Sequence, residues 1–460
     1  MICLWPLVSW ALWSRLDPGR ALIWTLLAGY LLLPPLTAID LPAVPDLDKA
    51  SIPSLAALVL AWVLLGDRVG FDPGNWLGRG LIGLFVLSPF ATVLTNGEPI
   101  EIEAGDIQGM TLYDSVAAVA NKAIVILPFF MARRYLATGA AMRDILAALV
   151  IAGVAYSVPM LIETRLSPQM NVWVYGFFQH DFFQTVRASG YRPVVFLPHG
   201  LWAAFFALMC FVAAVVLFRQ APAVDRPKRA VAAGYLGLLL LACKSAGPLL
   251  YGLALTPLVL FAGRRGQVLI AAVLAVLVVS YPLSRGLHLV PVDRLVEIAT
   301  EFNPARGGSL AFRIENEEQL LAHAAEKPLF GWGGYGRNML HDPVTGRTLT
   351  IADGTWIITL SIYGWLGYIA EFGLLALPLL LLAREVWGAR DVSPHAAAVA
   401  LLLAVNMVDL LPNATMIPFT WLMAGALMGH AQMLQAARCD GQRAVALRQM
   451  HGASSGKTVI

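Results

Sequence analysis

The chain has few charged residues. Of its 460 residues only 13% are charged, whereas 58% are hydrophobic. A soluble domain carries roughly 25% charged residues. This deficit excludes an ordinary soluble protein and predicts an all-α protein that crosses a membrane several times. The formal net charge of +3 does not indicate nucleic acid as a partner.

Cysteine frameworks and metal-binding motifs are also missing. The four cysteines lie singly, with no CxxC pair, so neither disulfides nor a cysteine metal site is indicated. The eight histidines show no HExxH or other metal-ligand spacing. The run Gly331–Gly336 has the glycines of a dinucleotide fingerprint, but no strand precedes it. We interpret it as a tight return to the membrane, and we predict no metal and no cofactor.

The apolar residues gather into segments of membrane-helix length. A spanning helix needs about 20 mostly apolar residues. The chain has about twelve or thirteen such segments, depending on whether 230–262 is divided into two helices. We expect one transmembrane domain over 1–435 and a cytoplasmic tail at 436–460. The predicted spans are 2–13, 21–37, 52–66, 79–95, 113–131, 142–162, 193–218, 230–243, 246–262, 267–283, 354–383, 394–411 and 415–435.

The positions of basic residues predict the orientation. Every second connection is rich in arginine, and this bias marks the cytoplasmic side. The intervening short connections at 40–49 and 96–106 are mostly acidic. These two connections, with the longer ones at 163–192 and 284–352, should therefore lie outside. The basic residues of the cytoplasmic set are Arg15, Arg20, Arg68, Arg79, Arg133, Arg134, Arg143, Arg219, Arg226, Lys228, Arg229, Arg264, Arg265, Arg384, Arg390, Arg438, Arg443, Arg448 and Lys457.

The outer loop 284–352 is the longest polar interval and the place to look for chemistry. Its run Ser309–Lys327 has a helical pattern that Pro328 should stop. Arg313 and Glu317 are four residues apart and can pair on the helix surface. The pattern fits an amphipathic helix on the membrane, and such a helix can also roof a cavity. Its apolar face should hold Leu310, Ile314, Leu321 and Ala325.

Further candidates come from the other outer connections. Arg187 and Arg192 precede an apolar run, and His199 should lie about two turns inside it. Ionisable groups at such depths usually face a cavity or a pathway. The alternatives are that the arginines reach lipid headgroups and that His199 caps a kinked helix. Lys244, beside a helix break, can meet a phosphate or a headgroup.

The order of these features resembles the O-antigen ligase and O-antigen polymerase superfamily of bacterial polysaccharide assembly. The likeness covers residues 180–375, less than half of the chain. Ligases of this family carry a histidine where Asp353 stands, and His341 lies twelve residues earlier. The matching segments are Arg187–Gly190, Lys244–Gly247, Arg313 followed by Glu326–Gly333, Asp353–Trp356 and Tyr363–Gly367.

The resemblance implies a glycosyltransferase of the bacterial inner membrane that works without metal or ATP. It would polymerise undecaprenyl-pyrophosphate-linked oligosaccharide repeats at the periplasmic face, among membrane lipids and with a flippase and a chain-length regulator as further partners. On this interpretation Arg187, Arg192 and Arg313 bind the pyrophosphate. The same site includes Lys244 and His199.

The sequence leaves two candidates for the catalytic base and three for the function class. A base must accept the proton of the attacking sugar hydroxyl, and Asp353 or His341 could serve. The nearest alternative function is a ligase that moves a finished glycan to lipid A-core or another acceptor. A polytopic transporter or flippase is a third, although the inverted repeats typical of transporters are not evident.

Overall fold

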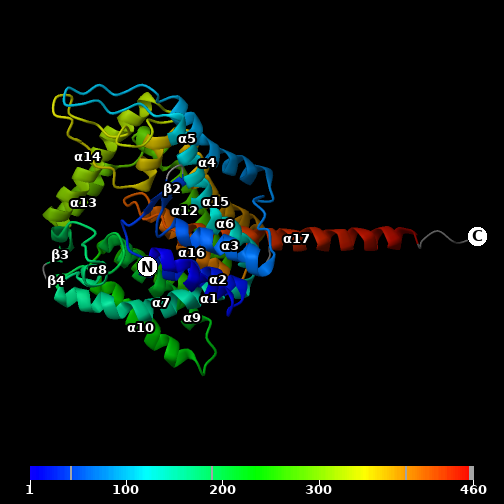
Figure 1. The fold of residues 1–460 in the computed structure, drawn as a ribbon. Coiled ribbons are helices and arrows are strands. Elements are labelled where there is room, and N and C mark those ends of the chain that lie inside the picture. The colour runs from blue at the N-terminus through cyan, green and yellow to red at the C-terminus, as the bar shows by residue number, and fades with distance from the viewer. Residues whose placement is uncertain (42–43, 188–189, 389–390, 455–460) are drawn as a thin grey trace, which may run out of the picture.

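The computed structural model describes residues 1–41, 44–187, 190–388 and 391–454 (Figure 1). The fold is all-α, as predicted, with two short hairpins, β1 (Ile39–Leu41) with β2 (Val44–Leu47) and β3 (Val186–Arg187) with β4 (Gly190–Tyr191). Short 3-10 helices are η1 (Ile2–Leu4) and η2 (Phe182–Thr185). The α-helices are α1 (Trp5–Trp13), α2 (Pro18–Leu32), α3 (Ser51–Leu65), α4 (Trp76–Leu94), α5 (Leu112–Val125), α6 (Leu127–Tyr135), α7 (Gly139–Leu166), α8 (Met170–Tyr175), α9 (Gly200–Arg219), α10 (Arg226–Ala242), α11 (Ala246–Phe261), α12 (Arg264–Gly286), α13 (Val292–Phe302), α14 (Pro304–Glu326), α15 (Thr355–Trp387), α16 (Pro394–Asp409) and α17 (Pro418–Ser454).

The protein is a multi-pass membrane protein by the length and hydropathy of its helices. Within the described ranges, six helices are long and apolar enough to cross a membrane, and four shorter apolar helices accompany them. All the predicted segments overlap helices, but fewer than predicted reach the length of a full span. The six long ones are α4, the continuous pair α5–α6, α7, α9, α12 and α15.

The core of the bundle forms around α9. This helix is apolar on all sides, and most of its residues are buried. An apolar helix in a membrane can face either lipid or other helices, and the burial of α9 shows that other helices surround it. It contacts α7, α10 and α11, and it therefore fixes the elements whose ends meet at the candidate site.

Helix α15 is broken at Gly364, and the glycine-rich loop covers the break. Gly364 has a φ of 64° and a ψ of −167°, and a Cβ there would lie 2.4 Å from the Leu329 carbonyl oxygen. The amide of Trp332 donates to the Ser361 carbonyl at 2.8 Å, and the Trp365 amide donates to the Pro328 carbonyl at 2.8 Å. The loop thus satisfies backbone groups that the break leaves open.

Helices α13 and α14 lie at one edge of the bundle, away from the end where α17 projects (Figure 1). The predicted helix stop is confirmed, because α14 ends at Glu326. The predicted apolar face is correct only in part. Leu310, Ile314 and Leu321 are half-buried and Ala325 is exposed, whereas the fully buried positions of α14 are Gly307, Asn316, Leu320 and Ala324. A polar residue belongs to the packed face because the Asn316 side chain accepts a hydrogen bond from the Ile351 amide at 2.7 Å.

Two predicted boundaries are also corrected. Helix α7 continues to Leu166, so Glu163 is helical and not part of the loop 163–192. The span predicted from 193 begins only at Gly200, because Pro193 and Pro198 flank a non-helical segment that other elements hold. The predicted tail is helical to Ser454, and its last residues lie outside the described part of the chain.

The charge bias makes a topological prediction that reporters can check. An enzyme reporter that is active only in the periplasm, fused near Pro343, should be active, because loop 284–352 is expected outside. The same reporter fused after Gly441 should be inactive, with comparable amounts of both fusions on an immunoblot as the control. The reverse pattern would contradict the assignment of sides.

Candidate cationic site

Six of the seven predicted site residues line one cavity of about 900 Å³. It lies where β3, the starts of α9 and α11, α14, the start of α15 and the connection between α16 and α17 meet. Among its described lining residues, four are basic and one is acidic, a net charge of +3 with neutral histidines. The predicted residues that line it are Arg187, Arg192, His199, Lys244, Arg313 and Asp353.

The segment between β4 and α9 is buried without being helical, and α7 holds it. The Glu163 carboxylate accepts hydrogen bonds from the amides of Val194 at 2.8 Å and Val195 at 2.7 Å. The Tyr156 hydroxyl accepts from the Phe196 amide at 3.1 Å. Buried backbone amides need such partners. Glu163 and Tyr156 therefore position Arg192 at one end of the segment.

The stem of Arg192 lies against the first turn of α9. A Cβ at Gly200 would approach Arg192 Cδ to 2.2 Å, so a larger residue there would displace the Arg192 side chain. The Arg192 Nε is buried, with no hydrogen-bond partner among the described residues. Burial, together with the charge of Arg187, lowers the pKa of Arg192 to about 10. An anion in the cavity would relieve this repulsion and pair the guanidinium.

His199 caps α9, and the prediction that it lies two turns inside a span is wrong. Its Nδ1 accepts a hydrogen bond from the Leu201 amide at 2.9 Å, which confirms the capping alternative. Burial and the neighbouring His180 and arginines lower the pKa of His199 to about 3. The ring is therefore neutral at pH 7, and Nε2, which carries the proton, lies 3.4 Å from Oε1 of Gln184, another residue of the cavity lining.

Arg313 and Asp353 form an ion pair in the lining of the same cavity. Arg313 Nε lies 3.2 Å from Asp353 Oδ2, and Arg313 Nη1 donates to the Pro412 carbonyl at 3.4 Å. The predicted surface pair with Glu317 is replaced by this contact, because α14 packs with that face toward α15. The pair places a guanidinium and a carboxylate side by side in the same cavity.

Backbone dipoles add to the positive potential. The first turns of α9 and α11 contribute Leu201 and Ala246 to the lining, and helix N-termini carry partial positive charge and unpaired amides. Lys244 comes just before α11 and also lines the cavity. Burial, then the charge of Arg165, lowers the pKa of Lys244. The whole arrangement is suited to a large anion.

His341 does not line this cavity. It pairs with Thr348 in an isolated β-bridge, and its Nε2 lies 2.9 Å from the Gly336 carbonyl oxygen. The loop around it folds on itself, since the Asp342 carboxylate accepts from the amides of Val344 and Thr345. Of the two predicted bases, only Asp353 is among the described residues that line the cationic cavity.

Glu317 is a residue whose position the sequence did not predict. The Trp356 indole donates to its carboxylate at 3.4 Å. Burial raises the pKa of Glu317 to about 7, and hydrogen bonding and the nearby Arg285 oppose this only in part. Its one sequence signal was its place one turn after Arg313. A half-buried carboxyl whose pKa is raised to near neutral is typical of functional sites.

The raised pKa of Glu317 predicts a pH-dependent stability. Between its ordinary value of 4.5 and about 7, the folded protein binds a proton that the unfolded chain releases, so stability falls as pH rises through this window. We expect the apparent Tm of the wild type to fall relative to that of Glu317→Gln between pH 5 and pH 8. Thermal unfolding in one detergent, with the exposed neighbour Glu318 changed to Gln as the matched control, measures this. Parallel curves for wild type and Glu317→Gln would contradict it.

The comparisons with known proteins identify no family. No protein-family model matches the chain, and no curated protein matches it. The fold and the helix composition show a multi-pass helical membrane protein. The reaction therefore has to be argued from the cavity itself.

Proposed function

We propose that the protein is a membrane glycosyltransferase that polymerises oligosaccharide repeats carried on undecaprenyl pyrophosphate. The observation that carries this proposal is the convergence of Arg187, Arg192, Lys244 and Arg313 with one carboxylate, Asp353, in a single cavity. A pyrophosphate is the anion that needs several fixed cations, and guanidinium groups bind its oxygens in pairs. The proposed location is the periplasmic face of a bacterial inner membrane, with a flippase and a chain-length regulator as partners.

In the proposed reaction, a hydroxyl of one lipid-linked glycan attacks the anomeric carbon of another. A new glycosidic C–O bond forms while the C–O bond to the pyrophosphate breaks. Asp353 takes the hydroxyl proton, and the arginines stabilise the charge that develops on the leaving undecaprenyl pyrophosphate. Since the energy comes from the activated donor, the step needs no ATP and consumes no second co-substrate.

A reaction with one substrate tests the proposal. Purified protein with a single lipid-linked repeat unit, without added ATP or metal, should give a ladder of longer lipid-linked glycans and release undecaprenyl pyrophosphate. Gel separation and mass spectrometry detect both products, and Arg192→Ala protein provides the inactive control. If the repeat stays unextended until a separate lipid or protein acceptor is added, the protein is a ligase. If no glycan is transferred to either acceptor, the proposal is wrong.

A further inference from the structure

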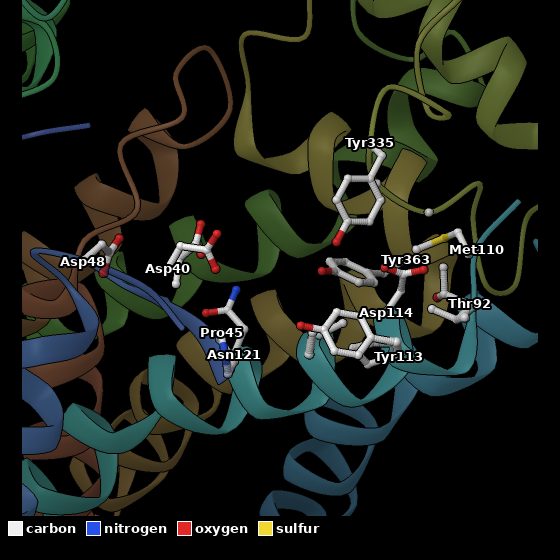
Figure 2. A pocket seen from close by; sticks show the side chains of 17 residues that line it. Asp40, Pro45, Asp48, Thr92, Met110, Tyr113, Asp114, Asn121, Tyr335 and Tyr363 are labelled. Carbon is white, nitrogen blue, oxygen red and sulfur yellow. The ribbon is translucent and has the colours of Figure 1, made fainter. Parts of the chain in front are cut away.

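A second cavity of about 440 Å³ is lined by tyrosine and carboxylate side chains (Figure 2). Within the described chain, no arginine, lysine or histidine lines it, and it shares no lining residue with the cationic cavity. Its walls come from the β1–β2 hairpin and the residues just after it, the end of α4, one face of α5, the glycine-rich loop and α15. The polar and aromatic members are Asp40, Asp46, Asp48, Thr92, Tyr113, Asp114, Asn121, Tyr335 and Tyr363.

Tyr363 is held in place by a buried ion pair. Lys122 Nζ lies 2.7 Å from the Glu371 carboxylate and 4.5 Å from the ring centres of both Phe85 and Tyr363. Burying such a pair within membrane helices is costly, and charged groups there usually serve a function. In this structure the pair fixes one face of the Tyr363 ring, directly before the break at Gly364. The ring is therefore presented to the cavity in one orientation.

Tyr335 comes from the glycine-rich loop on the opposite side. Its hydroxyl points toward Tyr363 and Asp114 in Figure 2, and burial together with the nearby Asp114 carboxylate raises the pKa of Tyr335. Asp114 also accepts from the Thr111 amide at 2.7 Å, which fixes it at the start of α5. The backbone of Tyr335 has a φ of 57°, an uncommon conformation for a residue with a side chain. The loop thus holds a largely exposed tyrosine over the cavity.

A third cavity of about 490 Å³ is adjacent to both the tyrosine cavity and the cationic cavity. It shares Asp46 and Asp48 with the tyrosine cavity and Trp202 with the cationic cavity. Lys49, beside Asp48, donates to the Phe196 carbonyl at 2.8 Å, and Phe196 belongs to the segment that carries Arg192. The third cavity is therefore a neighbour of both the tyrosine cavity and the cationic cavity.

We propose that the tyrosine cavity is a carbohydrate subsite that binds a sugar ring of the glycan substrate. Aromatic rings offer flat apolar faces to the C–H side of a pyranose, while carboxylates and amides bond its hydroxyl groups. A metal ion is not favoured, since no three His, Cys, Asp or Glu side chains of the described residues are grouped as ligands. That the sugar belongs to a lipid-linked glycan rests on the proposed function. The sugar binding itself rests on the cavity.

Binding of simple glycosides to the full-length protein in detergent tests this. The probes are the methyl glycosides of glucose, galactose, rhamnose and N-acetylglucosamine, and saturation-transfer NMR measures their binding. We expect at least one probe to bind, and we expect Tyr335→Ala and Tyr363→Ala to weaken it about tenfold, the loss of one aromatic contact. Tyr335→Phe and Tyr363→Phe keep the rings and should stay within about threefold of the wild type. They also separate a lost contact from misfolding.

Two further measurements keep this test separate from that of the proposed function. Arg192→Ala should leave glycoside binding unchanged, whereas binding of inorganic pyrophosphate should be lost in Arg192→Ala and kept in Tyr335→Ala. If glycosides bind through the tyrosines and pyrophosphate does not bind, the sugar subsite stands and the proposed reaction fails. The subsite is overturned if no glycoside binds or if both Ala variants bind as the wild type does. The carboxylates of the cavity would also suit a polycation, so the subsite is likewise overturned if the polyamine spermidine displaces the glycosides and binds more tightly than they do.

Discussion

Replacing Arg192 or Arg313 by alanine is expected to abolish polymer formation while the protein level stays normal. Both guanidinium groups line the cationic cavity, and together they can hold the two phosphates of the leaving group. Removal of one donor that stabilises developing charge costs a factor of about 10² to 10³ in rate. The same loss is expected for Arg187→Ala. Ladder formation from the lipid-linked repeat, per mole of purified protein, is the measurement.

The lysine variants make the reason for this loss specific. Arg192→Lys and Arg313→Lys keep a positive charge but cannot bind two oxygens through a planar fork. They should recover only part of the activity. Arg294→Ala is a matched control, because Arg294 is exposed on α13 and does not line the cavity. Near-normal polymer from all three alanine variants would instead mean that these arginines only anchor the protein to lipid headgroups.

The arginines could be predicted from the sequence because a charged side chain next to a membrane segment costs free energy, however the helices pack. The cost is set by the local sequence, so Arg187, Arg192 and Arg313 stand out without knowledge of partners. The sequence does not predict that these three arginines line the same cavity. Their convergence depends on the short hairpin of Arg187, the buried segment before α9 and the packing of α14 on α15, which come from distant parts of the chain.

Glu163 and Glu317 show what the sequence could not provide. Glu163 appeared to begin a loop, yet it holds that loop through the amides of Val194 and Val195. Glu317 appeared to be a surface partner of Arg313, yet it turns toward Trp356. In both cases the partner lies more than 30 residues away in the chain. Helical periodicity gives a residue's face, but it does not give the element that packs against that face.

The break at Gly364 is a further example. The sequence there reads as one long apolar helix, and glycine within such a helix is common in membrane proteins. The kink arises because the loop from Pro328 to Gly333 supplies hydrogen bonds to the opened turn. Both the loop and the broken part of α15 contain glycines, and the sequence shows each of these segments on its own. Their pairing is a tertiary contact that also places Tyr335 and Tyr363 on one cavity.

The last prediction concerns the catalytic base. Asp353→Asn should reduce ladder formation by about 10² to 10⁴, the usual contribution of a general base, because Asp353 is the carboxylate among the described lining residues of the cationic cavity. His341→Ala should leave the rate close to that of the wild type, since the His341 ring is engaged with the Gly336 carbonyl outside this cavity. The measurement is the initial rate of ladder formation.

Asp353 also pairs with Arg313 at 3.2 Å, so a lost base has to be distinguished from a displaced arginine. Asparagine removes the negative charge beside the arginine, and affinity for inorganic pyrophosphate should therefore hold or increase in Asp353→Asn while the rate falls. Loss of pyrophosphate binding together with the rate would make Asp353 a positioning residue for Arg313. In that case Glu317, whose pKa near 7 suits proton transfer at neutral pH, becomes the base to test, and Glu317→Gln should then lower the rate without lowering pyrophosphate affinity.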